Sequence, residues 1–251
     1  MSDLPVVSIQ NLSKSFRQNN GESLKVLHDI SFSVEQNEII AIVGHSGCGK
    51  TTLLRIVCGF EKPDEGYILL DGNKHEKPNK NALMLFQDFN QLLPWKTLLG
   101  NVIHPLTTTK SVKLRQDAKK FALKRIADVG LAGFERSYPH QLSGGMKQRA
   151  AVARALALQP RVLLMDEPFA SLDNITRGTL QSLTRRVCEK YGISAILVTH
   201  SVEEAVLMAD RVIVMDRNPG RIKADLKNDK KDAPVERRLA FVAETLHTLS
   251  E

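Results

Sequence analysis

The segment "GHSGCGKTT" at 44–52 constrains the fold of this chain more than any other. It matches the spacing G-x-x-x-x-G-K-[ST] without a mismatch, and a largely apolar segment, 38–43, stands directly before it. Glycines let the backbone turn tightly with its N–H groups directed inward, where they can hold phosphate oxygens. A chance glycine turn would not need a strand before it and a helix beginning near Gly49. The segment therefore predicts a phosphate-binding loop in an α/β fold.

The residues of this loop have different expected roles. Lys50 is expected to reach the β- and γ-phosphates, and the Thr51 hydroxyl to bind Mg²⁺. The dipole of the following helix adds a favourable potential for anions. Because Cys48 lies inside the loop, a bulky maleimide adduct on its sulfur is expected to block nucleotide entry. The predicted nucleotide contacts are Gly44, His45, Ser46, Gly47, Cys48, Gly49, Lys50, Thr51 and Thr52.

A second apolar segment, "VLLMDE" at 162–167, ends in two acidic residues. Asp166 is expected to lie beside the glycine loop and to hold Mg²⁺, through water. Glu167 is placed to orient and polarise an attacking water molecule. The alternative is a strand that merely ends in two solvated acids. Pro168 disfavours it, because it stops the strand where the acids lie.

The hydrophobic pattern predicts two kinds of strand and a helical insert. Alternation of apolar and polar residues at the N-terminal end favours half-buried antiparallel strands, whereas short apolar runs later in the chain favour strands buried on both faces. Strands alternating with helices indicate a mainly parallel sheet covered on both sides. The expected strands are 6–16, 24–38, 38–43, 66–72, 82–87, 162–166, 194–200 and 211–216, and the expected helices include 174–190 and 202–209.

Composition limits the possible settings of the protein. The chain has 251 residues, 42% of them hydrophobic and 25% charged, which is typical of a folded globular protein. No apolar run reaches the roughly 18 residues of a membrane-spanning helix, and the N-terminus lacks a secretory pattern, so a membrane role is expected to be peripheral. The net charge of +7 is compatible with nucleic acid, an anionic membrane surface or a phosphate-rich ligand.

Together with "LSGGMKQR" at 142–149, these motifs resemble the ATP-binding subunit of an ABC transporter. The resemblance covers about residues 1–225, and Met146 stands where the family signature LSGGQ has Gln. It implies an α/β P-loop NTPase core with a mainly parallel sheet, an N-terminal antiparallel β-subdomain and a helical insert at about 88–158. Residues 226–251 are expected to form a short linker and a helix. The implied activity is hydrolysis of ATP to ADP and phosphate with Mg²⁺.

The resemblance also assigns residues outside the two motifs. Phe16 falls where the family stacks an aromatic ring on adenine, although a core Phe at a strand end is an equal alternative. Gln87 falls at the loop glutamine that contacts Mg²⁺ and senses the γ-phosphate, and His200 at the switch histidine that binds the γ-phosphate. The implied catalytic residues are Lys50, Gln87, Glu167 and His200, and the implied metal-binding residues are Thr51, Gln87 and Asp166.

The second glycine-rich turn raises the question of what it binds, because one nucleotide needs one phosphate loop. In the family, two copies face each other head to tail. The resemblance therefore implies that Ser143, Gly144 and Gly145, at a helix N-terminus, close over the γ-phosphate of ATP bound to a second copy of the chain. The "SLD" segment at 171–173 resembles the loop through which the copies contact each other. A helix start of purely structural use would explain neither the serine nor the paired glycines.

Two further segments, 86–102 and 216–222, resemble the nitrate, sulfonate and taurine branch of bacterial importers. The cluster Leu92, Leu93, Pro94 and Trp95 is expected to dock a transmembrane permease subunit, with packing inside the helical insert as the alternative. The expected location is the cytoplasmic face of the inner membrane, as a peripheral subunit. A periplasmic or extracellular solute-binding protein is an indirect partner.

Two other classes of protein are alternatives to a transport ATPase. A soluble ABC-type ATPase acting on DNA or ribosomes is the runner-up, but such proteins typically carry long coiled-coil insertions or two cassettes in one chain. This sequence has no sustained heptads and one copy of each motif, so nucleic acid is not expected as a partner. A P-loop kinase would not explain the signature segment 142–149 or the pair Asp166 and Glu167.

Overall fold

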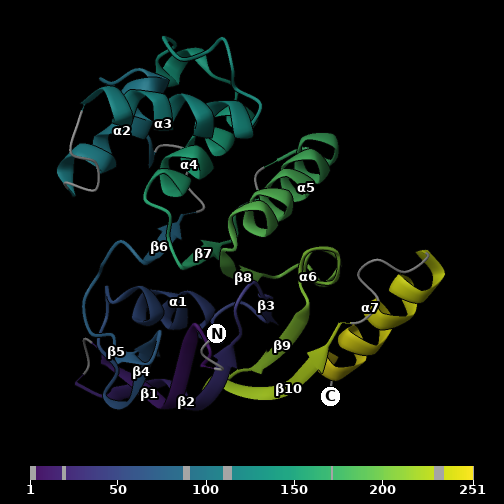
Figure 1. Cartoon of the computed structure of the whole chain (residues 1–251). Helices are drawn as coiled ribbons and strands as arrows, with labels where there is room; N and C mark the ends of the chain where they lie inside the picture. Colours follow the sequence, from purple (N-terminus) through teal and green to yellow (C-terminus); the bar gives the residue numbers. More distant parts are fainter. Residues whose placement is uncertain are drawn as a thin grey trace.

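The computed structural model describes residues 4–18, 21–86, 91–109, 115–170, 172–228 and 235–250. A six-stranded sheet with the order β10-β9-β3-β8-β7-β6 forms the centre of the molecule (Figure 1). All its neighbouring pairs are parallel except β10 with β9. This confirms the predicted mainly parallel sheet. Its strands are β3 (Ile39–Gly44), β6 (Ala82–Leu85), β7 (Val162–Asp166), β8 (Ser194–Thr199), β9 (Arg211–Asp216) and β10 (Arg221–Lys227).

The edge strand β10 is not among the strands predicted from the sequence, the last of which is 211–216. Residues 221–227 instead pair antiparallel with β9, and they alternate between exposed and partly buried positions. An edge strand covered on one face has no need of an apolar run, so the pattern that marks the inner strands is missing. The strand also continues two residues beyond the boundary predicted at 225.

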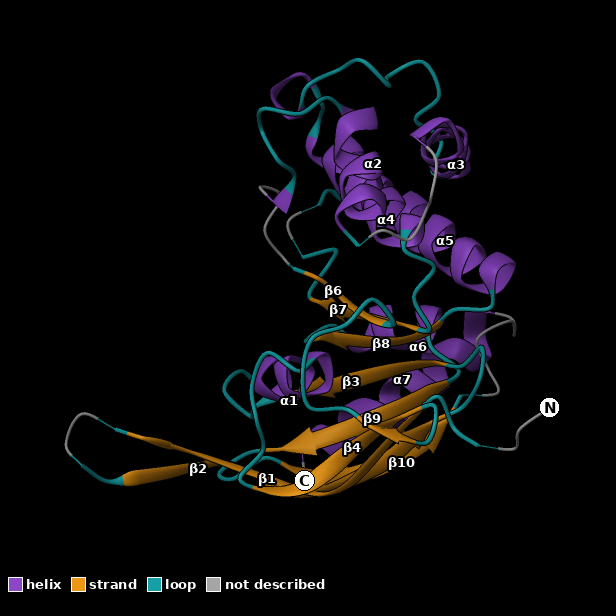
Figure 2. Ribbon diagram, turned by 60° about the vertical axis from the view of Figure 1, so that its left-hand side comes forward, coloured by secondary structure: helices purple, strands orange, loops and turns teal. Residues whose placement is uncertain are grey.

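A second, antiparallel sheet lies against the first and confirms the reading of the N-terminal segments. Its strand order is β2-β1-β4-β5. Figure 2 shows the strands β1 and β2 extending together beyond the rest of the molecule. Buried side chains of this sheet, of the helix α1 and of one face of the central sheet form one hydrophobic core. The elements are β1 (Val7–Arg17), β2 (Ser23–Val34), β4 (Glu65–Leu70), β5 (Asn73–Lys74) and α1 (Lys50–Cys58).

The chain between β6 and β7 forms the predicted helical insert. Its helices pack on one another and stand apart from α1 in Figure 1. They share a second hydrophobic core with the opposite face of the central sheet. The helices are α2 (Leu98–Thr108), α3 (Arg115–Asp128), a 3-10 turn (Pro139–Gln141) and α4 (Gly144–Ala157).

The described part of the chain also contains the helices α5 (Asn174–Tyr191), α6 (Val202–Met208) and α7 (Val235–Ser250). The C-terminal helix α7 was predicted, and it packs on α6 and β9 with Phe241 buried. Among the helices described, none is both long enough and apolar enough to cross a bilayer.

The parallel register brings the functional segments to one edge of the sheet. Val43 of β3 lies beside Thr199 of β8, and Val198 of β8 lies beside Asp166 of β7. The loops that follow these three strands therefore leave the sheet at the same edge, the usual place for ligands in such folds. The glycine loop, the acidic pair and His200 all follow directly from these strand ends.

Candidate functional site

The glycine loop, residues 44–49, joins the end of β3 to α1. Gly47 and Gly49 have φ angles of +84° and +95°, a left-handed conformation that residues with a Cβ atom rarely adopt. A Cβ at Gly49 would also lie 2.6 Å from Cδ2 of Leu27 in β2. Conformation and close packing therefore both require glycine at this position.

The start of α1 presents backbone N–H groups suited to an anion. Its N-cap is Gly49, and no side chain makes a capping hydrogen bond there. The first N–H groups of a helix have no partner within the helix, and the helix dipole favours negative charge at this end. His45, Ser46 and Gly47 in the adjoining loop are exposed. This helix end is therefore suited to a phosphate group.

Lys50 lies inside the curve of the loop. The residue is only 7% exposed although it carries a charge. Its Nζ donates hydrogen bonds to the carbonyl oxygens of Gly44 at 2.7 Å and His45 at 3.0 Å. A buried ammonium held in this way acts on a bound phosphate through a medium of lower dielectric than water, which strengthens the attraction.

A hydroxyl–carboxylate pair connects α1 to β7. Oγ1 of Thr51 donates to Oδ1 of Asp166 at 3.1 Å. Burial raises the pKa of Asp166, and the hydrogen bond from Thr51 opposes that rise. Mg²⁺ in nucleotide sites takes one or two protein oxygens and completes its octahedron with phosphate oxygens and water. Thr51 and Asp166 therefore fit the predicted metal-binding role.

Glu167 and His200 contact each other across neighbouring strands. Glu167 has a φ of +44°, a strained conformation for a residue with a Cβ atom, and its N–H donates to the carbonyl oxygen of Val198 at 2.9 Å. Its Oε2 lies 2.8 Å from Nδ1 of His200. The sequence predicted both residues at the site, and the structure adds that they form a pair.

The residues around His200 are held by a hydrogen-bond network in which Ser201 and Glu204 make only one of the two bonds of a capping box. Ser201 Oγ does accept from the N–H of Glu204 at 3.2 Å. The Glu204 carboxylate, however, accepts from Oγ1 of Thr199 at 2.7 Å instead of from the N–H of Ser201. That N–H donates to Thr199 Oγ1 at 3.0 Å. Both neighbours of His200 are thus anchored to the start of α6.

The signature segment begins α4, away from the glycine loop of the same chain. Figure 1 shows α4 among the helices of the insert and α1 beside the antiparallel sheet. Ser143 is the N-cap of α4, and its Oγ accepts from the N–H of Met146 at 3.3 Å. A Cβ at Gly145 would lie 2.6 Å from Cγ2 of Thr176, whereas a Cβ at Gly144 would meet no atom within 4 Å. Packing within the chain explains Gly145 but not Gly144.

The other predicted residues differ in how far they are described and how exposed they are. Gln87 and Ser171 lie outside the residues that the structure describes. Phe16 lies near the end of β1 and is 38% exposed, so it is not a core residue. Cys48 is fully buried, and burial raises the pKa of its thiol despite the nearby Lys50. The expected maleimide reaction of Cys48 is therefore not supported for the folded chain.

The predicted docking cluster, residues 92–95, contains both a buried residue and an exposed one. Leu92 is 3% exposed and belongs to the core, as the packing alternative had it. The backbone N–H of Leu93 donates to Oδ1 of Asn101 at 2.7 Å, which fixes the chain there. Trp95 is 70% exposed. The surface available to a partner is thus centred on Trp95.

Gln148, which was not predicted from the sequence, is a buried link between α4 and the segment that follows β7. Its Nε2 donates to the carbonyl oxygen of Pro168 at 2.7 Å. The signature helix is thereby tied to the segment that carries Asp166 and Glu167. A polar residue one helical turn after Gly144, within a helix rich in alanine, was the available signal.

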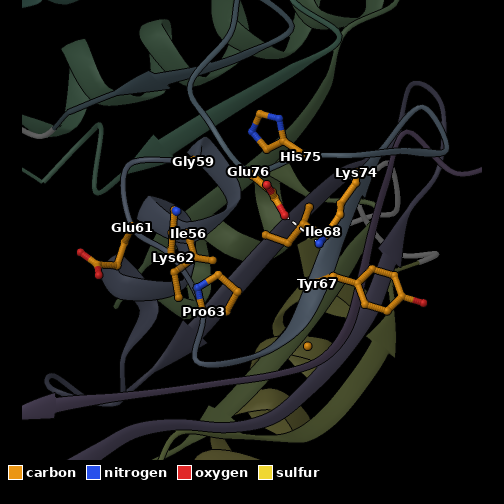
Figure 3. A pocket seen from close by; sticks show the side chains of 11 residues that line it. Ile56, Gly59, Glu61, Lys62, Pro63, Tyr67, Ile68, Lys74, His75 and Glu76 are labelled. Carbon is orange, nitrogen blue, oxygen red and sulfur yellow. Dashed lines mark ion pairs between the residues drawn. The ribbon is translucent and has the colours of Figure 1, made fainter.

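A pocket of about 210 Å³ lies at the far end of α1 from the glycine loop. Figure 3 shows Lys74 and Glu76 paired at one wall, and the ion pair between them measures 2.7 Å. Glu61 on the other side points away from the remaining side chains (Figure 3). The pocket contains none of the predicted site residues, so it is separate from the candidate nucleotide site.

Comparison with known proteins agrees with these features. A family model described as "ABC transporter" matches residues 27–170. An uncharacterized ABC transporter ATP-binding protein of Methanocaldococcus jannaschii is 46% identical over 89% of this chain and 82% of its own length. An aliphatic sulfonates import ATP-binding protein of Bacillus thuringiensis subsp. konkukian is 40% identical over 89% of this chain and 86% of its own length.

Other relatives are longer than this chain. A bicarbonate transport ATP-binding protein of Synechocystis sp. is 39% identical over 85% of this chain, which spans only 32% of that relative. Among solved structures, a dimeric ATP-binding cassette in a post-hydrolysis state bound to ADP and Pi has a TM-score of 0.76 and 30% identity. That match covers 88% of this chain and 98% of the other.

Proposed function

Because this chain belongs to the ABC transporter family, as an ATP-binding subunit with ATPase activity, we propose that it powers import of a small anion through a separate membrane permease. The observation that carries the proposal is the match, over most of both chains, to a protein that imports aliphatic sulfonates. Relatives named for bicarbonate and nitrate transport support the same class of solute. The subunit would then lie at the cytoplasmic face of the membrane, held there by its permease.

The proposed cycle begins with ATP bound to the glycine loop. The N–H groups at the start of α1 and the Lys50 ammonium hold the phosphates. Thr51 and Asp166 would hold Mg²⁺, which supplies charge neutralisation at the phosphate oxygens. Phe16 stacks on the adenine, and Gln87 senses the γ-phosphate.

Hydrolysis is assigned to the pair of Glu167 and His200. The Glu167 carboxylate accepts a hydrogen bond from the attacking water and orients it toward the γ-phosphate. The contact with Nδ1 of His200 holds that carboxylate at the end of β7, and the imidazole adds a contact to the γ-phosphate. Loss of the γ-phosphate removes the group on which Glu167 and His200 both act.

We further propose that two copies enclose two ATP molecules. Gly144 has open space where a side chain would be, at an N-terminal helix end that carries no phosphate loop of its own. The γ-phosphate bound by the Lys50 loop of a second copy fits that position. The dimeric cassettes among the solved relatives support this arrangement.

The transport proposal is tested in the membrane. A tagged chain, expressed in its own organism, is purified from membranes with its permease, and the complex is reconstituted in liposomes. We expect ATP hydrolysis to be coupled to uptake of one solute among sulfonates, taurine, nitrate and bicarbonate. Recovery of the chain with ribosomes or DNA, and without any membrane subunit, would contradict the proposal and favour the soluble alternative.

The docking surface is tested in the same preparation. Trp95→Asp should reduce recovery of the permease while ATP binding by the isolated chain persists, because Trp95 is 70% exposed. Leu92→Asp is the contrasting variant, and it should unfold the insert because Leu92 is 3% exposed. A Trp95→Asp protein that retains the permease in full would exclude this surface as the docking site.

A further inference from the structure

Lys14 in β1 is a buried lysine that the proposed cycle does not use. It is 9% exposed, and its Nζ lies 3.1 Å from both Oε1 of Glu61 and Oδ1 of Asp64. The other oxygen of Asp64 accepts from the N–H of Ser15 at 2.7 Å. Burial opposes the charged form of Lys14, but the two carboxylates outweigh it and raise its pKa. The ammonium therefore stays charged and is fixed to the segment between α1 and β4.

The same ammonium lies over the ring of Phe16. Its Nζ is 5.2 Å from the ring centroid, within the range of a cation–π contact. The pairing of β1 with β2 shifts register between Lys14 and Ser15, and the two side chains meet at this irregular part of the strand. Phe16 is 38% exposed and the ammonium lies at one face of its ring, so a stacked base would have to use the opposite face.

This part of β1 and β2 borders the phosphate site. Phe16 pairs with Leu24 of β2, and Lys14 pairs with Leu27. A Cβ at Gly49 would lie 2.6 Å from Cδ2 of Leu27 and 3.1 Å from Cγ1 of Val26, so β2 packs directly on the last residue of the glycine loop. The ring of Phe16 is therefore carried by the strand pair against which the phosphate loop rests.

From this arrangement we propose that Lys14 is a positioning residue for the nucleotide base, acting through the ring of Phe16. The ammonium, held by Asp64 and Glu61, restrains the ring at one face. It also attracts the π-electrons of the ring, which lowers the repulsion between the far face and the π-cloud of a stacked purine. The inference rests on the proposed role of Phe16 as the adenine contact.

The test separates binding of the base from binding of the phosphates. Affinities for ATP and for inorganic tripolyphosphate, which has no base, are measured by calorimetry for the full chain. Lys14→Met should weaken ATP binding about three- to ten-fold and leave tripolyphosphate binding unchanged. Lys14→Arg keeps a cation near the carboxylates and the ring, so it should restore ATP binding to within about two-fold.

A double-mutant cycle shows whether Lys14 acts through Phe16. Phe16→Leu alone should weaken ATP binding selectively, and adding Lys14→Met to it should produce little further loss. Lys190→Met is the matched control. Lys190 also contacts a carboxylate, Asp128 at 2.6 Å, and an aromatic ring, Tyr191 at 5.4 Å, but in a different part of the fold. It should change neither affinity.

Three results would overturn the proposal, and they have different meanings. Equal weakening of ATP and tripolyphosphate by Lys14→Met would show that the lysine supports the fold of the phosphate site. Unchanged ATP binding in Lys14→Met, with a clear loss in Phe16→Leu, would remove Lys14 alone from the base site. Unchanged ATP binding in Phe16→Leu would remove the adenine assignment itself, and the role of Lys14 with it.

Discussion

Oε2 of Glu167 lies 2.8 Å from Nδ1 of His200, although the two residues are 33 positions apart in the chain. Glu167 follows β7 and His200 follows β8, and these strands pair in parallel so that Asp166 lies beside Val198. The pairing of the strands therefore brings a carboxylate and an imidazole together at one edge of the sheet.

Glu167→Gln should abolish most ATP hydrolysis and leave ATP binding intact. The amide keeps the size of the side chain but cannot act as a base, and a positioned base typically contributes about 10²–10⁴-fold to the rate. The variant should accumulate as an ATP-dependent dimer, which size-exclusion chromatography with light scattering detects. With Mg·ADP it should remain monomeric. Glu203→Gln, in the exposed first turn of α6, is the control and should hydrolyse ATP normally. Normal turnover by Glu167→Gln would exclude the assigned role.

Gly144→Arg, added to Glu167→Gln, should abolish the ATP-dependent dimer. A Cβ at Gly144 would lie in open space, so the monomer should keep its melting temperature and its affinity for ATP. The arginine would instead occupy the place of the second copy's phosphate. The control Gly145→Ala should lower the melting temperature, because its Cβ would lie 2.6 Å from Thr176 Cγ2. Persistence of the dimer in the Gly144→Arg double mutant would refute the head-to-tail arrangement.

Cys48 should resist N-ethylmaleimide in the folded protein, contrary to what its place in the loop suggested. Its side chain is fully buried, so the maleimide has little access to the sulfur. Burial also raises the pKa of the thiol, so little of it is present as the reactive thiolate. The buried Cys58 and Cys188, with pKa values raised to about 11 and about 12, should react no faster. Mass spectrometry should find no rapid adduct on the native chain at pH 7 and three adducts in urea. Rapid labelling of Cys48 with loss of ATPase activity would restore the original expectation.

Asp128→Asn should destabilise the contact between the helical insert and α5. Oδ1 of Asp128 lies 2.6 Å from Nζ of Lys190, and Oδ2 accepts from Tyr191 and from Arg125. Asp128 and Arg125 are buried but Lys190 is half exposed, so the substitution should cost about 2 kcal/mol in the free energy of unfolding, measured by urea denaturation at pH 7. The control Asp225→Asn breaks a pair with Arg211 in which the aspartate is 41% exposed, and it should cost less than about 1 kcal/mol.

The effect of Asp128 should also depend on pH. Burial favours the neutral carboxyl, but the bonds with Lys190, Tyr191 and Arg125 outweigh it and lower the pKa of Asp128 below 3.8. A carboxyl with a lowered pKa in the folded state stabilises the protein above its unfolded pKa, and the contribution is lost as the pH falls through the folded pKa. The difference between wild type and Asp128→Asn should therefore be constant near neutrality and shrink below about pH 4. A difference that grows in acid would contradict this role.

The sequence by itself determined the features that depend on neighbours in the chain. The loop 44–49 is a local constraint, because glycine spacing, the preceding apolar strand and the following helix lie within about 20 residues. The inner strands β3, β7 and β8 could be predicted because strands buried on both faces need continuous apolar runs. The acidic pair and His200 were found because each stands at the end of such a run.

Only the tertiary structure decided which distant residues meet and which side chains are buried. The contacts of Lys14 with Asp64 and of Glu167 with His200 join different segments, and no local pattern encodes them. Cys48 stands in a loop, yet the packing around it buries the side chain fully. The edge strand β10 has no apolar run, because it is defined by its hydrogen bonds to β9. In each case the deciding energy comes from packing or pairing between segments far apart in sequence, which depends on the assembled sheets and is absent from the local pattern of residues.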